Sequence, residues 1–476
     1  EEDPEEIFSG VLDGLTAVLR KADLKTGTLK GVSFSAALHS LILLDENYKP
    51  LTRAITWADN RAVKYADELR ENGVGKQLYE KTGTPIHPMT PLSKLIWLRN
   101  DQPDLFKKAS WFVGIKEYVL YKLFGQLKEE YSTANATGMF NIFNMDWDDQ
   151  ALEVAGVTRD QLPELVDTTD KMVGLRDEYA RVIGIEKDVP FIMGATDGPL
   201  SNLGVNAIDP GVVAVTIGTS GAVRVITDKP RIDPKARVFC YYLAPNKWVV
   251  GGPVNNGGIV FRWVRDQLFA PEKITAEQMQ IDSYDLLTQI AEKIPAGSDG
   301  LIFDPFLGGE RETIWDANAR GSFFGLTRTH TRAHMVRAAL EGIVYNLYTV
   351  MLALEEVVGK PKSIQATGGF ARSALWRQML ADIFEQDVTI PESFEGTALG
   401  AAVLGMYSLG IIDDLSEVKK FVGVTNVHHP NPETFEAYRT LVPIYIRLSR
   451  LLQTEYKNIA EFQRNEEQKK QNQNDD

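Results

Sequence analysis

The chain has 476 residues, of which 44% are hydrophobic and 24% are charged. At roughly 100–200 residues per domain this length predicts two or three domains. This length excludes a miniprotein, and the composition, which is typical of soluble globular proteins, argues against fibrous or disordered chains. The 51 Lys and Arg against 65 Asp and Glu give a net charge of −14. This acidic balance argues against a generic binder of nucleic acid or anionic membranes, because such binders need positive surface.

A single cysteine, Cys240, can form neither an intrachain disulfide nor a Cys-rich zinc site. No stretch approaches the ~20 apolar residues of a membrane span. The first residues, EEDPEEIF, are acidic where a signal peptide is basic. We therefore expect a cytoplasmic protein without a membrane anchor.

The first part of the chain predicts a strand-and-helix pattern. Asp3-Pro4, followed by apolar residues at helical spacing, predicts a helix over about 4–19. Residues 31–35 and 41–44 predict strands, and residues 60–187 predict mainly helices. Residues 189–198 predict a buried strand that stops at a polar turn.

The same pattern continues after a turn-rich stretch at 206–211. The predicted elements are a hairpin (212–217 and 222–226), a strand (247–252), helices (259–268 and 333–358), a strand (362–367) and helices (372–384 and 433–462). This alternation predicts two α/β domains, at 1–207 and 208–455. The polar tail at 463–476 is expected to be disordered.

The most informative local motif is Gly194-Ala-Thr-Asp197-Gly198, which places a carboxylate directly after an apolar strand. In open α/β sheets, ligands bind at the carboxyl ends of the strands. A carboxylate there can accept the proton of a substrate hydroxyl, so Asp197 is a candidate general base. An Asp that caps a helix beginning near Pro199 explains the motif equally well.

Two glycine-containing turns are candidates for ligand binding. The stretch TIGTSGA at 216–222 offers backbone N–H groups and hydroxyls that suit phosphate oxygens, although taken alone a plain hairpin turn explains it better. Gly368-Gly369 lies at a predicted strand-to-helix junction, where a planar group can approach the backbone closely. Tight packing of the strand on the helix is the alternative there.

Five stretches together resemble the FGGY family of carbohydrate kinases, in the superfamily of sugar kinases, actin and heat-shock ATPases. MTPLSKLIWL at 89–98 resembles the family's first signature, and GSFFGL at 321–326 with HMVRAALE at 334–341 resembles its second. GTSGA and TGGFARS are similar to its second phosphate motif and its adenosine motif. The matches follow the family's order up to about residue 455. The resemblance implies a two-domain α/β fold of the ribonuclease-H-like, actin-like ATPase type, with a cleft between the domains.

The resemblance also implies a kinase that phosphorylates a small-molecule sugar with Mg²⁺ and ATP. Asp197 would deprotonate the terminal hydroxyl of the sugar and contribute to the Mg²⁺ site. The residues that would bind ATP are Gly218, Thr219 and Ser220 at the phosphates and Gly368, Gly369 and Ser373 near the adenosine. The residues that fall where relatives line the sugar pocket are His39, Asp59 and Arg61, with Tyr131 and Asn256 as further neighbours.

Within the family, the chain is most similar to gluconate kinases, in stretches such as FSAALHS, ITWADNR, GTPIHPM and MGATDGPLSNLGVNA. This similarity implies phosphorylation of D-gluconate to 6-phospho-D-gluconate. Arg61 suits such a substrate because a guanidinium binds a carboxylate through two parallel hydrogen bonds, but a surface ion pair also explains it. For His39 the competing explanation is a histidine at the edge of the core bonded to backbone. The sequence leaves the oligomeric state open, a homodimer included.

One family feature has no counterpart in this sequence. FGGY members begin with a strand hairpin that carries an Asp-x-Gly-Thr phosphate motif, whose Asp helps hold the metal, and this sequence starts at the helix that follows it. We expect an N-terminally truncated chain rather than an inactive relative. The alternatives are a xylulose or other pentulose kinase, or a non-catalytic protein that binds sugar or nucleotide.

Overall fold

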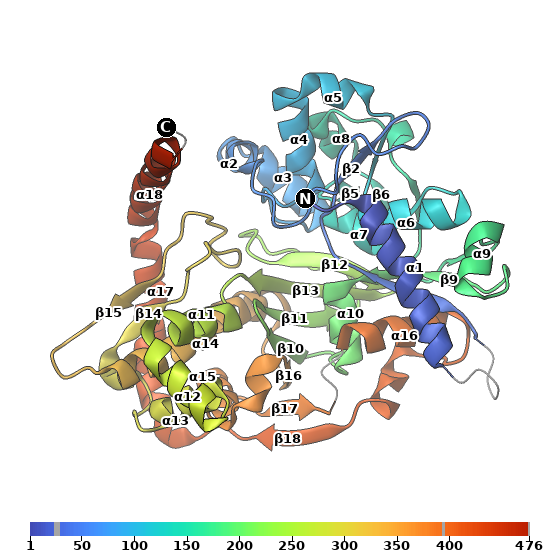
Figure 1. The fold of residues 1–476 in the computed structure, drawn as a ribbon. Coiled ribbons are helices and arrows are strands. Elements are labelled where there is room, and N and C mark those ends of the chain that lie inside the picture. Colours follow the sequence, from blue (N-terminus) through green and yellow to red (C-terminus); the bar gives the residue numbers. More distant parts are fainter. Residues whose placement is uncertain (23–28, 393–395, 475–476) are drawn as a thin grey trace. The chain divides into compact units, whose positions relative to one another are not determined.

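The computed structural model describes residues 1–22, 29–392 and 396–474 (Figure 1). The chain divides into two compact units, and each unit is assembled from three segments of the chain. Unit 1 consists of Glu1–Pro210, Ile226–Val250 and Glu395–Val422, and unit 2 of Gly211–Val225, Gly251–Phe394 and Gly423–Asp476. In the described part of the chain, no helix combines the length and the apolar character needed to cross a membrane.

Unit 1 contains a three-stranded sheet built on the strands predicted near 31–35 and 189–198. In it β1 (Val32–Ala36) runs parallel to β9 (Phe191–Thr196), and β8 (Lys171–Met172) pairs antiparallel with β9. Gly194 in β9 has a φ of +72°, and a Cβ built on it would lie 1.9 Å from the Phe34 carbonyl oxygen. Only glycine allows the two strands to approach this closely at that point.

The first helix of unit 1 starts where the sequence predicts, and the region 60–187 is largely helical as expected. In α1 (Pro4–Lys21) the Asp3 side chain accepts a 2.9 Å hydrogen bond from the Glu5 N–H, as expected of an N-cap before proline. The predicted helical region contains α2 (Val63–Glu71), α3 (Val74–Thr82), α4 (Pro91–Asp101), α5 (Pro103–Lys108), α6 (Ile115–Phe124), α7 (Tyr131–Ala136), α8 (Asp149–Ala155) and α9 (Asp177–Ile183). Short strands between them include β2 (Ile42–Leu44), β3 (Trp111–Val113), β4 (Lys128–Glu130) and β7 (Glu164–Val166).

Two further helices of unit 1 pack backbone against backbone. A Cβ built on Gly204 of α10 (Asp197–Gly204) would lie 1.7 Å from the Gly396 carbonyl oxygen of α16 (Gly396–Ser408). Likewise, a Cβ on Gly400 would lie 2.0 Å from the Leu200 carbonyl oxygen. Any side chain at Gly204 or Gly400 would therefore push the two helices apart.

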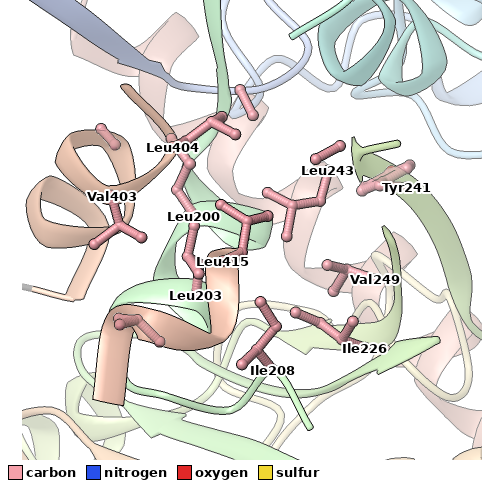
Figure 2. Packing of buried hydrophobic residues seen from close by; sticks show 14 of the residues in the cluster. Leu200, Leu203, Ile208, Ile226, Tyr241, Leu243, Val249, Val403, Leu404 and Leu415 are labelled. Carbon is pink, nitrogen blue, oxygen red and sulfur yellow. The ribbon is translucent and has the colours of Figure 1, made fainter. Parts of the chain in front are cut away.

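Apolar side chains surround this helix contact (Figure 2). They come from α10, from α16 and from the strands β12 (Phe239–Ala244) and β13 (Lys247–Val254), and include Leu200, Leu203, Tyr241, Leu243, Val249, Val403 and Leu404. Burial of such side chains contributes about 1.5–3 kcal/mol each. The cluster therefore holds α10, and with it the residue that opens this helix, in place.

In unit 2 neighbouring strands follow the order β11 (Gly221–Thr227), β10 (Val212–Ile217), β16 (Ser363–Thr367), β17 (Val388–Pro391) and β18 (Val424–His428), and β14 (Ile302–Asp304) pairs separately with β15 (Ser322–Phe324). β10 and β11 form the predicted antiparallel hairpin, and β10, β16 and β17 run parallel. The helices of this unit include α11 (Gly258–Trp263), α12 (Ala270–Met279), α13 (Ser283–Glu292), α14 (Arg332–Val358), α15 (Ala374–Phe384), α17 (Phe435–Leu451) and α18 (Gln453–Asn474). The helix predicted at 433–462 is thus two helices, α17 and α18.

The polar tail at 463–476, for which the sequence predicts disorder, is helical up to Asn474. Most of its residues are Glu, Gln, Lys and Asn, and Glu, Gln and Lys are good helix formers. Glu466 Oε1 and Lys469 Nζ, three residues apart, are 2.8 Å from each other. The expectation of disorder is therefore wrong for residues 463–474, because a polar composition prevents core burial but not helix formation.

Candidate functional site

The predicted general base, Asp197, lies directly after β9 as the first residue of α10. Its side chain is exposed, and its Oδ1 accepts a 2.7 Å hydrogen bond from the Gly198 N–H. The alternative prediction makes Asp197 the cap of a helix that begins near Pro199. In the structure the cap of α10 is Thr196, and Asp197 is already the first helical residue. A carboxylate in the first turn of a helix is stabilised in its charged form by the helix dipole. Asp197 therefore presents an accessible, charged carboxylate at the end of a buried strand.

His39 belongs to the same edge of the sheet of unit 1. Ala36, the last residue of β1, lies opposite Thr196, the last residue of β9, so the carboxyl ends of these two parallel strands are adjacent. Helix α7 contacts the segments that follow both strand ends. The Ser132 hydroxyl of α7 lies 2.8 Å from the Thr196 hydroxyl, and His39 Nδ1 lies 2.8 Å from the Ala136 carbonyl oxygen.

The side chain of His39 is buried and its backbone is in the left-handed region, with a φ of 67°. Because a carbonyl oxygen can only accept, the Nδ1 that faces the Ala136 carbonyl carries a proton. The competing explanation for His39, a histidine at the edge of the core bonded to backbone, therefore agrees with this hydrogen bond to the Ala136 carbonyl. A histidine held in this conformation requires firm support from its surroundings, and the role of His39 toward sugar stays a prediction.

A cavity of about 20 Å³ lies beside His39, with Glu117 and Glu129 among its lining residues. It is large enough for one water molecule and too small for a sugar. Both carboxylate oxygens of Glu117 lack a hydrogen-bond partner among the described residues, and burial raises the pKa of Glu117 to about 7. This cavity is not the predicted sugar pocket.

Asp59 and Arg61 form an ion pair in the segment before α2. The Asp59 carboxylate accepts hydrogen bonds from the Arg61 backbone N–H at 2.9 Å and from Arg61 Nε at 2.8 Å. Burial acts to raise the pKa of Asp59, but the hydrogen bonds from Arg61 outweigh burial, so the pKa is lowered. Arg61 Nη2 also binds Glu1, and its guanidinium lies 4.4 Å from the Trp97 ring centroid. The surface ion pair of the alternative explanation is present. Nη1 takes part in neither carboxylate contact.

Tyr131 is the first residue of α7 and is half-buried. Its ring packs against Phe140, with centroids 5.4 Å apart, and edge-on against Tyr242, with centroids 5.5 Å apart. Burial, and then the neighbouring carboxylates Asp167, Asp170 and Asp146, raise the pKa of Tyr131. Its hydroxyl therefore stays protonated at neutral pH and can donate a hydrogen bond.

In unit 2 the predicted phosphate turn connects β10 to β11. The Gly218 N–H donates to the Ser220 carbonyl oxygen at 2.9 Å, so the hairpin turn of the alternative prediction is present. Thr219 and Ser220 are exposed. A Cβ built on Gly218 would have no neighbour nearer than 4.0 Å. The turn thus combines exposed hydroxyls with open space, as phosphate oxygens require.

The predicted adenosine motif lies against this turn. Gly368 follows β16, has a φ of +108°, and would place a Cβ 2.2 Å from the Ile217 carbonyl oxygen and 3.1 Å from the Gly218 nitrogen. A Cβ on Gly369 would meet nothing within 4 Å. Two motifs that are far apart in the chain therefore form one surface of unit 2, and its close contact requires glycine at residue 368.

Ser373, the third predicted adenosine residue, caps α15. Its Oγ accepts a 3.2 Å hydrogen bond from the Trp376 N–H, and the residue is half-buried. The side chain thus has a structural role at the start of the helix. Its predicted place near adenosine stays a prediction.

Asn256 is 1% exposed and is fixed by a loop of unit 2. Its Nδ2 donates to the Gly309 carbonyl oxygen at 2.7 Å and to Glu310 Oε2 at 2.9 Å. Glu310, also 1% exposed, accepts a further 2.7 Å bond from Asn346 Nδ2. No local sequence pattern indicates the contacts of Glu310, because its partners Asn256 and Asn346 are distant in the chain.

Asp197 also suits a magnesium ion. Among residues 1–22, 29–392 and 396–474, no group of three or more His, Cys, Asp or Glu could hold a metal ion. Mg²⁺ usually keeps several waters and binds one or two carboxylates together with substrate phosphates. The exposed Asp197 carboxylate fits one such ligand position.

Comparisons with known proteins cover nearly the whole chain. The N-terminal domain of the FGGY family of carbohydrate kinases matches residues 1–204, and the C-terminal domain of that family matches residues 213–409. The gluconokinase of Bacillus subtilis (strain 168) is 52% identical over 465 residues, which cover 98% of this chain and 90% of that protein.

Solved structures of sugar kinases are also similar to this chain over nearly its whole length. A gluconate kinase from Lactobacillus acidophilus has a TM-score of 0.90 and 41% identity, covering 96% of this chain and 91% of that one. A ligand-bound xylulose kinase from Lactobacillus acidophilus has a TM-score of 0.91 and 41% identity, with the same coverage.

Proposed function

We propose that this chain, which belongs to the FGGY family of carbohydrate kinases, transfers the γ-phosphoryl group of ATP to D-gluconate and forms 6-phospho-D-gluconate. The observation that carries the choice of sugar is the nearly full-length likeness to the Bacillus subtilis gluconokinase. The likeness to solved sugar kinases confirms the predicted two-domain, mixed α/β fold of the actin-like ATPase type.

In this proposal Asp197 is the general base. It accepts the proton of the terminal hydroxyl of gluconate while the hydroxyl oxygen bonds to the γ-phosphorus and the bond from that phosphorus to ADP breaks. Its exposure at the end of β9 and its fixed backbone on α10 support this role. His39 and Tyr131, which lie at the two ends of α7, would orient the sugar.

The nucleotide would bind to unit 2. The exposed Thr219 and Ser220 hydroxyls and the open turn at Gly218 support phosphate binding, and the open face at Gly369 leaves room for the adenosine. Mg²⁺, bound to phosphate oxygens and to Asp197, would neutralise negative charge on the phosphates. Phosphoryl transfer depends mainly on such positioning and charge neutralisation.

The main alternative is a xylulose kinase, which the likeness to the ligand-bound xylulose kinase favours. ADP formation measured with gluconate, with xylulose and without sugar separates the candidates. We expect gluconate-dependent ADP formation well above both other reactions. Faster turnover of xylulose would contradict the choice of sugar, and gluconate binding without ADP formation would indicate a non-catalytic binding protein.

Arg61→Ala should raise the KM for gluconate roughly 10–100-fold and leave the KM for ATP unchanged, because a lost charged hydrogen bond costs about 1.5–3 kcal/mol. Steady-state kinetics with each substrate varied in turn measures this split.

Arg159→Ala is the matched control. Its side chain is 43% exposed, against 42% for Arg61, and it likewise pairs with two carboxylates, Asp146 and Asp149. We expect wild-type kinetics from this control. An unchanged gluconate KM in Arg61→Ala, together with efficient xylulose phosphorylation, would assign the chain to the pentulose kinases.

A further inference from the structure

Lys94, the fourth residue of α4, is a fully buried lysine, with 0% of its surface exposed. All residues of α4 from Pro91 to Leu98 are buried, so this helix has no solvent-facing side over that stretch. An ammonium group in such surroundings is costly unless its charge and its three donors are satisfied. The position of Lys94 therefore requires specific partners.

Its partners are three backbone carbonyl oxygens from two separate segments. Lys94 Nζ donates to the carbonyl of His39 at 2.6 Å, to that of Thr56 at 2.8 Å and to that of Ile55 at 3.1 Å. Three N–H donors thus meet three acceptors. Burial lowers the pKa of Lys94 to about 7, and the nearby Asp59 carboxylate acts in the opposite direction.

Both segments carry residues expected at the sugar. The proposed function gives His39 an orienting role, and the family resemblance places Asp59 and Arg61 at the sugar pocket. The first segment holds His39 in a left-handed backbone conformation, with a φ of 67°. The second continues from Thr56, whose carbonyl also accepts the Asp59 N–H at 3.2 Å, to the Asp59 and Arg61 pair. One ammonium group therefore joins the two backbone segments from which these side chains project.

We propose that Lys94 is a positioning residue of the sugar site, whose ammonium group fixes the backbone at residues 39 and 55–56 and so sets the places of His39 and of the Asp59–Arg61 pair. The proposal rests on the proposed function, because it assumes that these side chains meet the sugar. Lys94 acts through the backbone and does not touch the substrate.

Lys94→Met removes all three donors at similar volume, and Lys94→Gln keeps two donors on a shorter side chain. We expect the gluconate KM, and the gluconate Kd from calorimetry, to rise in the order wild type, Lys94→Gln, Lys94→Met. The rise in Lys94→Met should be roughly 10–100-fold. The KM for ATP should stay within about twofold in both variants. A loss of folding alone would not separate the two substrates in this way.

Arg237→Met is the control for the loss of a largely buried cation in the same unit. Arg237 is 17% exposed and binds Asp233 at 2.8 Å, in a loop that carries none of the predicted site residues. We expect it to lower the melting temperature and leave the gluconate KM unchanged.

Each outcome decides between the possibilities. If the wild-type chain neither binds nor phosphorylates gluconate, the proposed function fails. If the wild type does both and folded Lys94→Met keeps the wild-type gluconate KM, the positioning role is wrong. Should Lys94→Met fail to fold, Lys94→Gln with a wild-type gluconate KM, or with equal losses for gluconate and ATP, overturns the role equally.

Discussion

Asp197→Asn should lower kcat for gluconate phosphorylation by ~10²–10⁴-fold, which is the usual contribution of a general base. The gluconate Kd should stay within a factor of about three. Asn has the shape of Asp and keeps an oxygen that can accept the 2.7 Å bond from the Gly198 N–H, so the start of α10 should keep its geometry. Single-turnover kinetics and calorimetry with gluconate measure the two effects separately.

Asp177→Asn provides the matched control. Asp177 is also an exposed carboxylate in the first turn of a helix of unit 1, α9, and it pairs with Lys187 at 2.7 Å. This variant should keep wild-type turnover. Turnover of Asp197→Asn within a few-fold of wild type, in protein with a wild-type melting temperature, would show that Asp197 is not the base.

Gly368→Ala should weaken ATP binding by at least ~10-fold and leave gluconate binding within about twofold, since a loss of one or two phosphate hydrogen bonds costs a few kcal/mol. The reason is steric. The new Cβ would lie 2.2 Å from the Ile217 carbonyl oxygen, so the turn at Gly218 must move away from β16. Calorimetry with an ATP analogue and with gluconate compares the two sites in one protein.

Part of any loss of stability or ATP affinity in Gly368→Ala comes from the positive φ of +108° at this residue rather than from the contact of the new Cβ with the Ile217 carbonyl. Gly359→Ala isolates that part, because Gly359 has a φ of +88° and a Cβ there would meet nothing within 4 Å. It should cost about 1 kcal/mol in stability and leave the ATP Kd unchanged. Equal ATP affinities for the two variants would mean that the contact between the motifs does not support nucleotide binding.

Local signals were sufficient for the elements that carry the site. Asp3-Pro4 predicts the start of α1, the apolar run before Asp197 predicts β9, and the glycines at 218 and 221 predict a turn between two strands. These features depend on caps, on periodicity and on turn chemistry, which act over a few residues. Asp197 could therefore be placed at a strand end before the structure was known.

Contacts between distant segments could not be predicted in this way. The three carbonyl partners of Lys94 and the bonds of Glu310 to Asn256 and Asn346 depend on tertiary structure. For the contacts of Lys94, the local sequence offers one indication, which is a lysine among apolar residues of a predicted helix. The helix in the tail differs from the expectation for another reason, because a polar composition indicates the lack of core burial but not the helix propensity of Glu, Gln and Lys.

The assembly of unit 1 from three chain segments also affects how it folds during synthesis. Helix α16, which covers Leu200 and Gly204 of α10 and also contacts β1, belongs to the third segment. At about 5–20 residues per second, the ribosome needs roughly 10–40 s to add the residues between Gly204 and Gly396. Until then the apolar face of α10 has no partner helix, although most of the unit has already left the ribosome. Unit 1, whose synthesis begins before that of unit 2, is therefore completed late, and the surface of α10 that packs on α16 stays uncovered throughout that interval.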